Sequence, residues 1–148
     1  MKISTKITDI THDDLVDLFS TATYGSSWFG IRRPKGSYRG TELEDENDCR
    51  EDTWAKVLLN GGKVYFCDFY AEDEEDFYGT KNHAWRGDCM RYEINLDDIK
   101  YGLEKAFDSG GHIARRATRL MDRDNLDFDI EDAESLIQII MFGEEVYG

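Results

Sequence analysis

The chain has 148 residues and a formal net charge of −14, from 32 acidic side chains against 18 Lys and Arg. Hydrophobic residues make up 40% of it and aromatic residues 13%, which is enough to bury a core and excludes a disordered chain. Membrane surfaces and nucleic acids are anionic, so this charge disfavours both as direct partners and favours a basic protein. We therefore expect a single acidic domain spanning residues 1–148.

The cellular location is indicated by what the sequence lacks. The N-terminal residues have no apolar run of the kind found in signal peptides, and the longest apolar cluster, residues 136–142, is far too short to span a bilayer. Three cysteines without paired spacing indicate no disulfide framework. These features predict a cytoplasmic protein.

Five stretches have the apolar periodicity and end signals of helices. The last one is apolar on most sides, with only a narrow polar stripe formed by Glu131, Glu134, Ser135 and Gln138, so we expect it to be largely buried. The five predicted helices cover residues 11–24, a stretch ending at Leu59, and residues 97–108, 112–121 and 129–142.

Two stretches have the patterns of strands. Residues 63–70 form a nearly continuous apolar run, and residues 89–96 alternate between apolar and polar side chains. We expect these two strands to pair antiparallel at the centre of a small sheet. A short hairpin is expected between residues 28–31 and Tyr38, and residues 79–88 are expected to form a loop. The predicted fold class is α+β, with a small antiparallel sheet packed against about five helices.

The sequence contains no specific catalytic or metal-binding motif. The Cys and His residues lack the close spacing of zinc ligands, which leaves only a site assembled from dispersed positions as an alternative. Cys89 with His83 has the atoms of a nucleophilic pair, but no oxyanion-hole loop accompanies them. We expect no enzymatic activity and no cofactor. The alternative is a small enzyme or ligand-binding domain that uses Cys67, His83 and Cys89.

Basic residues are concentrated between residues 32 and 39, where Arg32, Arg33, Lys35 and Arg39 occur without an acid among them. Aromatic residues interleaved with basic ones are typical of nucleic-acid-binding surfaces. The net charge of −14 outweighs this pattern, so we expect these side chains to pair with the protein's own acids.

Nineteen of the 32 acids lie in three short stretches, residues 42–52, 72–76 and 122–134. Helix dipoles explain acids at helix starts, but they do not explain five consecutive acids at residues 72–76. Carboxylates on one face of an extended segment lie about 7 Å apart, comparable to successive phosphates on a nucleic acid, so they can displace counterions from a basic groove. The candidate partner-binding residues are Glu42, Glu44, Asp45, Glu46, Asp48, Glu72, Asp73, Glu74, Glu75, Asp76, Asp122, Asp124 and Asp127.

On these acid blocks, together with its small size and lack of catalytic motifs, the chain resembles in kind the small acidic anti-defence proteins of phages and mobile elements. Anti-CRISPR, anti-restriction and nuclease-neutralising immunity proteins form this class. The resemblance implies a non-enzymatic inhibitor that docks on a basic nucleic-acid-binding surface of a nuclease or defence complex by phosphate mimicry. An immunity-type protein that neutralises a basic toxin is the alternative within the class. The basic segments 32–39 and 115–119 depart from a pure mimic and indicate a separate basic face for self-association as a homodimer.

Removal of all metal ions with a strong chelator should leave the melting temperature unchanged, because the sequence provides no closely spaced ligand set. Circular dichroism melts with and without chelator measure this. A fall of many degrees would instead support the zinc site built from dispersed Cys and His ligands.

Overall fold

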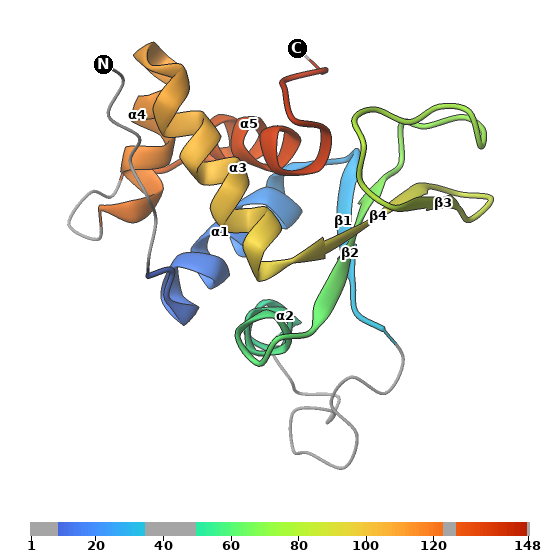
Figure 1. Ribbon diagram of the computed structural model, residues 1–148, viewed down its shortest axis with the longest axis horizontal. Helices are drawn as coiled ribbons and strands as arrows, with labels where there is room; N and C mark the ends of the chain where they lie inside the picture. Colours follow the sequence, from blue (N-terminus) through green and yellow to red (C-terminus); the bar gives the residue numbers. More distant parts are fainter. Residues whose placement is uncertain (1–8, 35–49, 123–126, 148) are drawn as a thin grey trace.

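A four-stranded antiparallel sheet in the order β1-β2-β4-β3 is packed on one side by the helices (Figure 1). The computed structural model describes residues 9–34, 50–122 and 127–147. This arrangement confirms the α+β class and the small antiparallel sheet. Within the described residues, no helix has the length and apolar character that a membrane crossing requires.

The central strands are β2 (Lys63–Asp68) and β4 (Met90–Asn95), which pair antiparallel as expected. β1 (Phe29–Arg32) adds to the other side of β2, and β3 (His83–Trp85) adds to β4. The expectation of a loop over residues 79–88 was therefore wrong for residues 83–85, where β3 forms. Three residues carry too weak an alternation to signal a strand, and only the available edge of β4 determines their pairing.

The expected extent of the first central strand was also too long. β2 ends at Asp68, and Phe69 and Tyr70 are 37% and 53% exposed after it. The backbone N–H of Tyr70 donates to the Asp68 carboxylate at 2.9 Å, which turns the chain away from the sheet. Tyr38, the expected hairpin partner of residues 28–31, lies outside the described residues.

Three of the helices, α1, α3 and α5, begin close to the expected positions because their first turns are capped. Thr11, Asn95 and Asp129 each accept the backbone N–H three residues later, and the acid at that later position bonds back to the N-cap backbone. Such capping boxes satisfy N–H groups that the helix itself leaves unpaired. The five helices are α1 (His12–Gly25), α2 (Arg50–Leu59), α3 (Leu96–Ser109), α4 (Gly111–Met121) and α5 (Ile130–Phe142).

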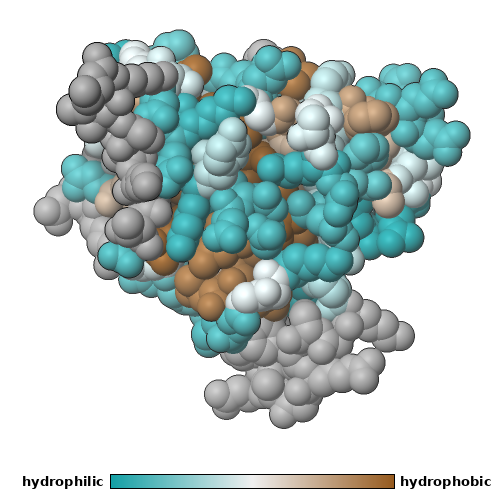
Figure 2. All heavy atoms as spheres, in the orientation of Figure 1, coloured by the Kyte–Doolittle hydropathy of each residue, from teal (hydrophilic) through white to brown (hydrophobic). Residues whose placement is uncertain are grey.

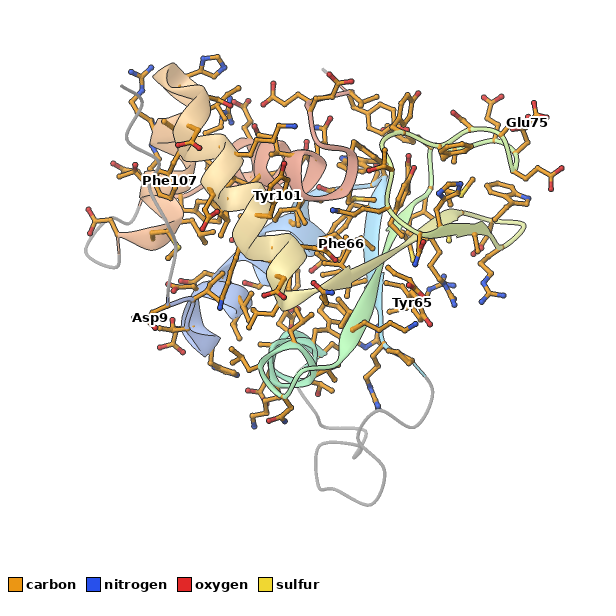
Figure 3. All side chains as sticks on the ribbon, viewed as in Figure 1. Asp9, Tyr65, Phe66, Glu75, Tyr101 and Phe107 are labelled. Carbon is orange, nitrogen blue, oxygen red and sulfur yellow. The ribbon has the colours of Figure 1, made fainter. Side chains whose placement is uncertain are left out.

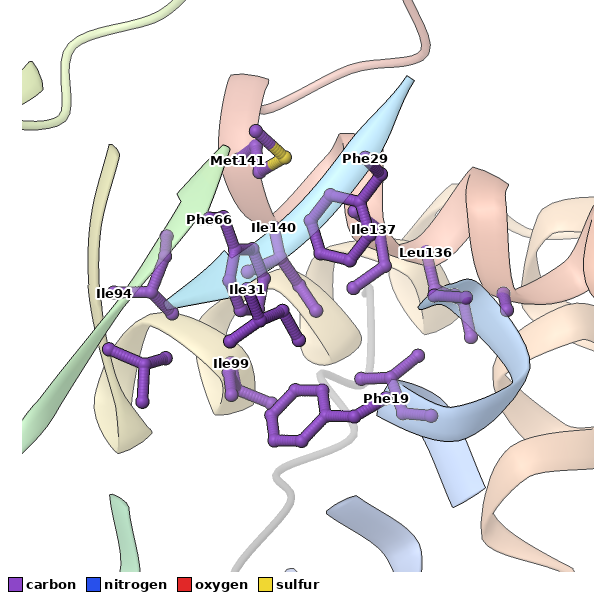
Figure 4. Close-up of a cluster of buried hydrophobic side chains, with 14 of the residues drawn as sticks. Phe19, Phe29, Ile31, Phe66, Ile94, Ile99, Leu136, Ile137, Ile140 and Met141 are labelled. Carbon is purple, nitrogen blue, oxygen red and sulfur yellow. The ribbon is translucent and has the colours of Figure 1, made fainter. Parts of the chain in front are cut away.

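The core lies between the sheet and the helices, with α5 at its centre. Phe66 and Ile94 reach from the sheet toward Phe19, Ile137 and Ile140 of the helices (Figure 4). In α5 every residue from 135 to 142 is buried. The expectation that the last helix is largely buried is confirmed.

Two residues of the expected polar stripe of α5 are buried instead of exposed. The side-chain oxygen of Gln138 accepts the backbone N–H groups of Val146 and Tyr147, each at 2.7 Å, and the hydroxyl of Ser135 donates to Glu145. These polar side chains hold the C-terminal segment, residues 143–147, against the helix. Their burial does not penalise the fold because each polar group has a partner.

Gly102 marks a close approach between α3 and α5. A Cβ atom at this position would lie 2.6 Å from Cγ1 and 2.9 Å from Cα of Ile140. Gly102→Ala should therefore lower the free energy of unfolding by about 1–2 kcal/mol, because overpacking exceeds the helix-propensity gain of about 1 kcal/mol. Urea denaturation measures this change.

The matched control is Tyr101→Ala at the neighbouring position of α3, where the side chain is 64% exposed (Figure 3). This substitution should change the unfolding free energy by no more than about 0.5 kcal/mol. A Gly102→Ala variant as stable as the unmodified protein would show that the two helices do not pack as closely as described.

Candidate functional site

The acidic run of residues 72–76 forms an exposed loop whose base is fixed by Asp68. This aspartate is fully buried at the end of β2, and its carboxylate accepts the hydroxyl of Tyr147 at 2.6 Å and the backbone N–H of Tyr70 at 2.9 Å. Burial raises the pKa of the Asp68 carboxyl above its usual value, and the two hydrogen bonds oppose that shift. Asp68 therefore joins the start of the loop to the C-terminal segment.

The far end of the loop is anchored by aromatic packing. The backbone N–H of Tyr78 donates to the hydroxyl of Tyr92 at 3.1 Å, and the Tyr78 ring lies 5.3 Å from the Phe142 ring. Gly79 has a positive φ of 79°, and a Cβ atom there would lie 2.8 Å from the Phe142 carbonyl oxygen. Only glycine fits this approach. The loop is thus held at both ends by residues of the sheet, α5 and the C-terminal segment.

Within the loop the five acids divide into two groups. Asp73 accepts the backbone N–H of Glu75 and Asp76 accepts that of Glu72, each at 3.0 Å, so these two carboxylates shape the turn. Glu72, Glu74 and Glu75 are exposed, and their side chains form no ion pair with any described residue. Glu75 lies at the outer edge of the molecule (Figure 3), where the surface is mostly hydrophilic (Figure 2).

The structure does not bring the other acid blocks to this loop. Asp122 and Asp127 are exposed and follow the C-terminal end of α4 in the chain. This end of α4 lies on the opposite side of the molecule from the loop between β2 and β3 (Figure 1). Of the remaining predicted partner-binding acids, Glu42, Glu44, Asp45, Glu46, Asp48 and Asp124 lie outside the described residues. Among the described positions, the predicted acids therefore occupy two separate ends of the molecule.

Two acids of the first and third blocks, Asp52 and Asp132, have structural partners. Asp52 contacts His12 at 2.5 Å and Lys56 at 3.0 Å. Asp132 is buried and pairs with Arg116 at 3.4 Å and Arg119 at 2.9 Å. These pairs neutralise part of the charge that the sequence alone counts as available for a partner.

The expected basic face on the fourth helix is correspondingly reduced. Arg116 and Arg119 turn toward Asp132 at the start of α5, and only Arg115 of the three is exposed. Arg32 of the other basic segment pairs with Asp88 at 3.5 Å, while Lys35 and Arg39 lie outside the described residues. Of the three arginines on α4, only Arg115 is therefore available for the expected self-associating basic face.

The cysteines and the histidine of the alternative site lie on different faces of the sheet. Cys67 is opposite Arg91 in the ladder and His83 is opposite Tyr92, so alternation places them on opposite faces. Burial raises the pKa of both thiols, that of Cys89 to about 12, so neither is ionised near neutral pH. The pairing of Cys89 with His83 as nucleophile and base is not supported by this arrangement.

No group of three or more His, Cys, Asp or Glu side chains in the described part of the chain is arranged to hold a metal ion. Cys49, one of the dispersed zinc-ligand candidates, lies outside it.

Comparisons of the chain with protein-family models, with curated proteins and with solved structures find no match.

Sequence reasoning missed Asp68 and Tyr147 as supports of the loop. Asp68 was counted as part of an apolar strand, and no local signal links it to a residue near the C-terminus. A single acid at the end of such a run, just before two aromatics, was the only available signal of a buried polar anchor.

Asp68→Asn should raise the free energy of unfolding at neutral pH. Because burial raises the pKa of the Asp68 carboxyl in the folded state, ionisation costs more there than in the unfolded chain. The Asn side chain can accept from Tyr70 N–H and donate to the Tyr147 hydroxyl. The advantage of the variant should vanish below the unfolded pKa of about 3.9, grow with pH, and level off above the raised folded pKa. Urea unfolding of both proteins from pH 4 to pH 8 measures it.

Tyr147→Phe provides the contrasting variant, because it removes the hydroxyl that donates to the ionised carboxylate. It should be less stable than the unmodified protein at neutral pH and closer to it in acid. If Asp68→Asn were the less stable protein at pH 7, the carboxylate would be better solvated than its burial indicates.

Proposed function

We propose that this protein is a non-enzymatic acidic inhibitor that binds the basic nucleic-acid-binding surface of a nuclease or defence complex. The acidic loop, residues 72–76, is the contact in this proposal. The class of small anti-defence proteins that the sequence resembles acts in this way, in the cytoplasm of the host cell.

The observation that carries the proposal is the state of three carboxylates. Glu72, Glu74 and Glu75 are exposed without an ion pair among the described residues, whereas Asp52 and Asp132 have cationic partners. Uncompensated charges close together repel each other, so they weaken the isolated protein. A basic partner would relieve this repulsion, and that favours a binding role for the loop.

The anchoring of the loop supports the same proposal. Asp68 and Tyr92 hold its two ends, and Asp73 and Asp76 shape its turn. A loop ordered before binding loses less conformational entropy when it docks. Its three glutamates can then replace phosphates in a groove lined with Lys and Arg and release the anions bound there.

The test is a cleavage-inhibition assay against a panel of purified nucleases: RNA-guided nucleases, restriction endonucleases and a basic DNase toxin. The variant is Glu72→Gln, Glu74→Gln and Glu75→Gln together, which leaves the turn-forming aspartates in place. We expect the unmodified protein to inhibit at least one nuclease and the triple variant to bind it at least tenfold more weakly. The slope of the logarithm of its binding constant against the logarithm of the salt concentration should become shallower by roughly two to three, because about three contacts are lost.

The matched control neutralises three exposed acids elsewhere: Asp9→Asn, Asp97→Asn and Glu131→Gln. It changes the net charge equally, so it separates a specific loop contact from general electrostatic attraction. Inhibition and salt dependence should stay close to those of the unmodified protein. Equal losses in both triple variants would remove the loop from its proposed role. Failure to inhibit any nuclease in the panel would overturn the inhibitor function.

A further inference from the structure

The face of the sheet turned away from the helices carries a second, chemically different surface. Alternation along the central strands directs Phe66 into the core and Tyr65 to the uncovered side (Figure 3). On this side the Arg91 guanidinium lies 4.5 Å from the centre of the Tyr65 ring, and Lys63 lies 5.7 Å from it. In a protein of net charge −14, this face gathers cations over an aromatic ring.

A pocket of about 110 Å³ opens on this face over β3, β4 and Tyr65 of β2. Its volume is several times the roughly 30 Å³ that one water molecule occupies in the liquid, which suits a group of the size of phosphate or carboxylate. The pocket is lined by Tyr65, Asn82, His83, Ala84, Arg86, Arg91 and Glu93.

The charge balance of the pocket is positive. Its single acid, Glu93, receives the Lys63 ammonium at 2.6 Å and the Asn82 amide at 3.2 Å, and the Lys63 hydrogen bond lowers the pKa of its carboxyl. The guanidinium groups of Arg86 and Arg91 have no carboxylate partner among the described residues. The positive charges of Arg86 and Arg91 can therefore attract an anion that enters the pocket.

Arg91 is held in place and is incompletely satisfied. Its stacking on Tyr65 orients the planar guanidinium, and its Nε is buried without any hydrogen-bond acceptor. A buried donor without an acceptor is unfavourable. The guanidinium fork matches the two oxygens of a phosphate or carboxylate better than an ammonium does.

We propose that this pocket binds a small oxyanion, a phosphate or carboxylate group, through Arg86 and Arg91. An adjoining pocket of about 260 Å³ shares Asn82 and Glu93 and gives space for the remainder of a larger ligand. The site lies on the sheet and uses none of the acids of the acidic loop. It is independent of the proposed inhibitor function, and either can fail without the other.

The test is a titration of the ¹⁵N-labelled full chain with inorganic phosphate in one arm and citrate in the other, at constant ionic strength. Binding should saturate, and the shifted amides should be those of β3, β4 and the turn between them. The arm with the lower dissociation constant identifies the source of the oxyanion. Shifts spread over the whole surface without saturation would overturn the proposal.

Two variants and a control locate the site. Arg86→Gln changes an exposed side chain, and Arg91→Gln removes the stacked one; each should weaken binding at least tenfold. Arg115→Gln removes the same charge from the exposed surface of α4 and should leave the affinity unchanged. Because Arg91→Gln also loses the contact with the Tyr65 ring, its melting curve is first compared with that of the unmodified protein. If Arg91→Gln is unfolded, the result for Arg86→Gln alone decides. Unchanged affinity in Arg86→Gln would refute the site.

Discussion

The antiparallel pairing of β2 with β4 is the constraint on which both surfaces of this protein depend. Its register places Phe66 opposite Tyr92 and Cys67 opposite Arg91. Side chains at successive positions leave a strand on opposite faces, so this one register decides which are covered by the helices and which face outward. A slip by one residue would move Phe66 out of the core and Tyr65 into it. The hydrophobic contact with α5 prevents such a slip.

The same pairing explains how a buried acid, Asp68, positions the exposed acidic loop. Asp68 is the last residue of β2 and falls on the covered face, where its carboxylate meets the Tyr147 hydroxyl. This contact turns the chain out of the sheet and joins it to the C-terminal segment. The acidic loop begins a few residues later, so this contact fixes its position. The turn at Asp68 both exposes the loop to solvent and anchors its first end.

The acids behind the net charge of −14 differ in their structural roles as well as in their positions. Asp132 forms ion pairs with two arginines, and the capping acids of α1, α3 and α5 stabilise the helix N-termini. Glu72, Glu74 and Glu75 have no such role in the described structure, whereas Arg86 and Arg91 on the uncovered sheet face are cations without acidic partners. The two groups present opposite charges on different surfaces, and each is the basis of a separate proposal.

Local signals in the sequence determined the helices, the two central strands and the exposure of residues 72–76. Caps such as Thr11 and Asp129 act within a few residues, and so does the alternation of residues 90–95, so no knowledge of distant contacts was needed. Tertiary structure alone decided the rest. The burial of Asp68 depends on Tyr147, near the C-terminal end of the chain. The pairing of β3, the partners of Gln138 and the pocket beside Arg91 depend on how the chain folds back at a turn. A sequence pattern reports the periodicity of one segment, but which groups meet depends on how the segments pack.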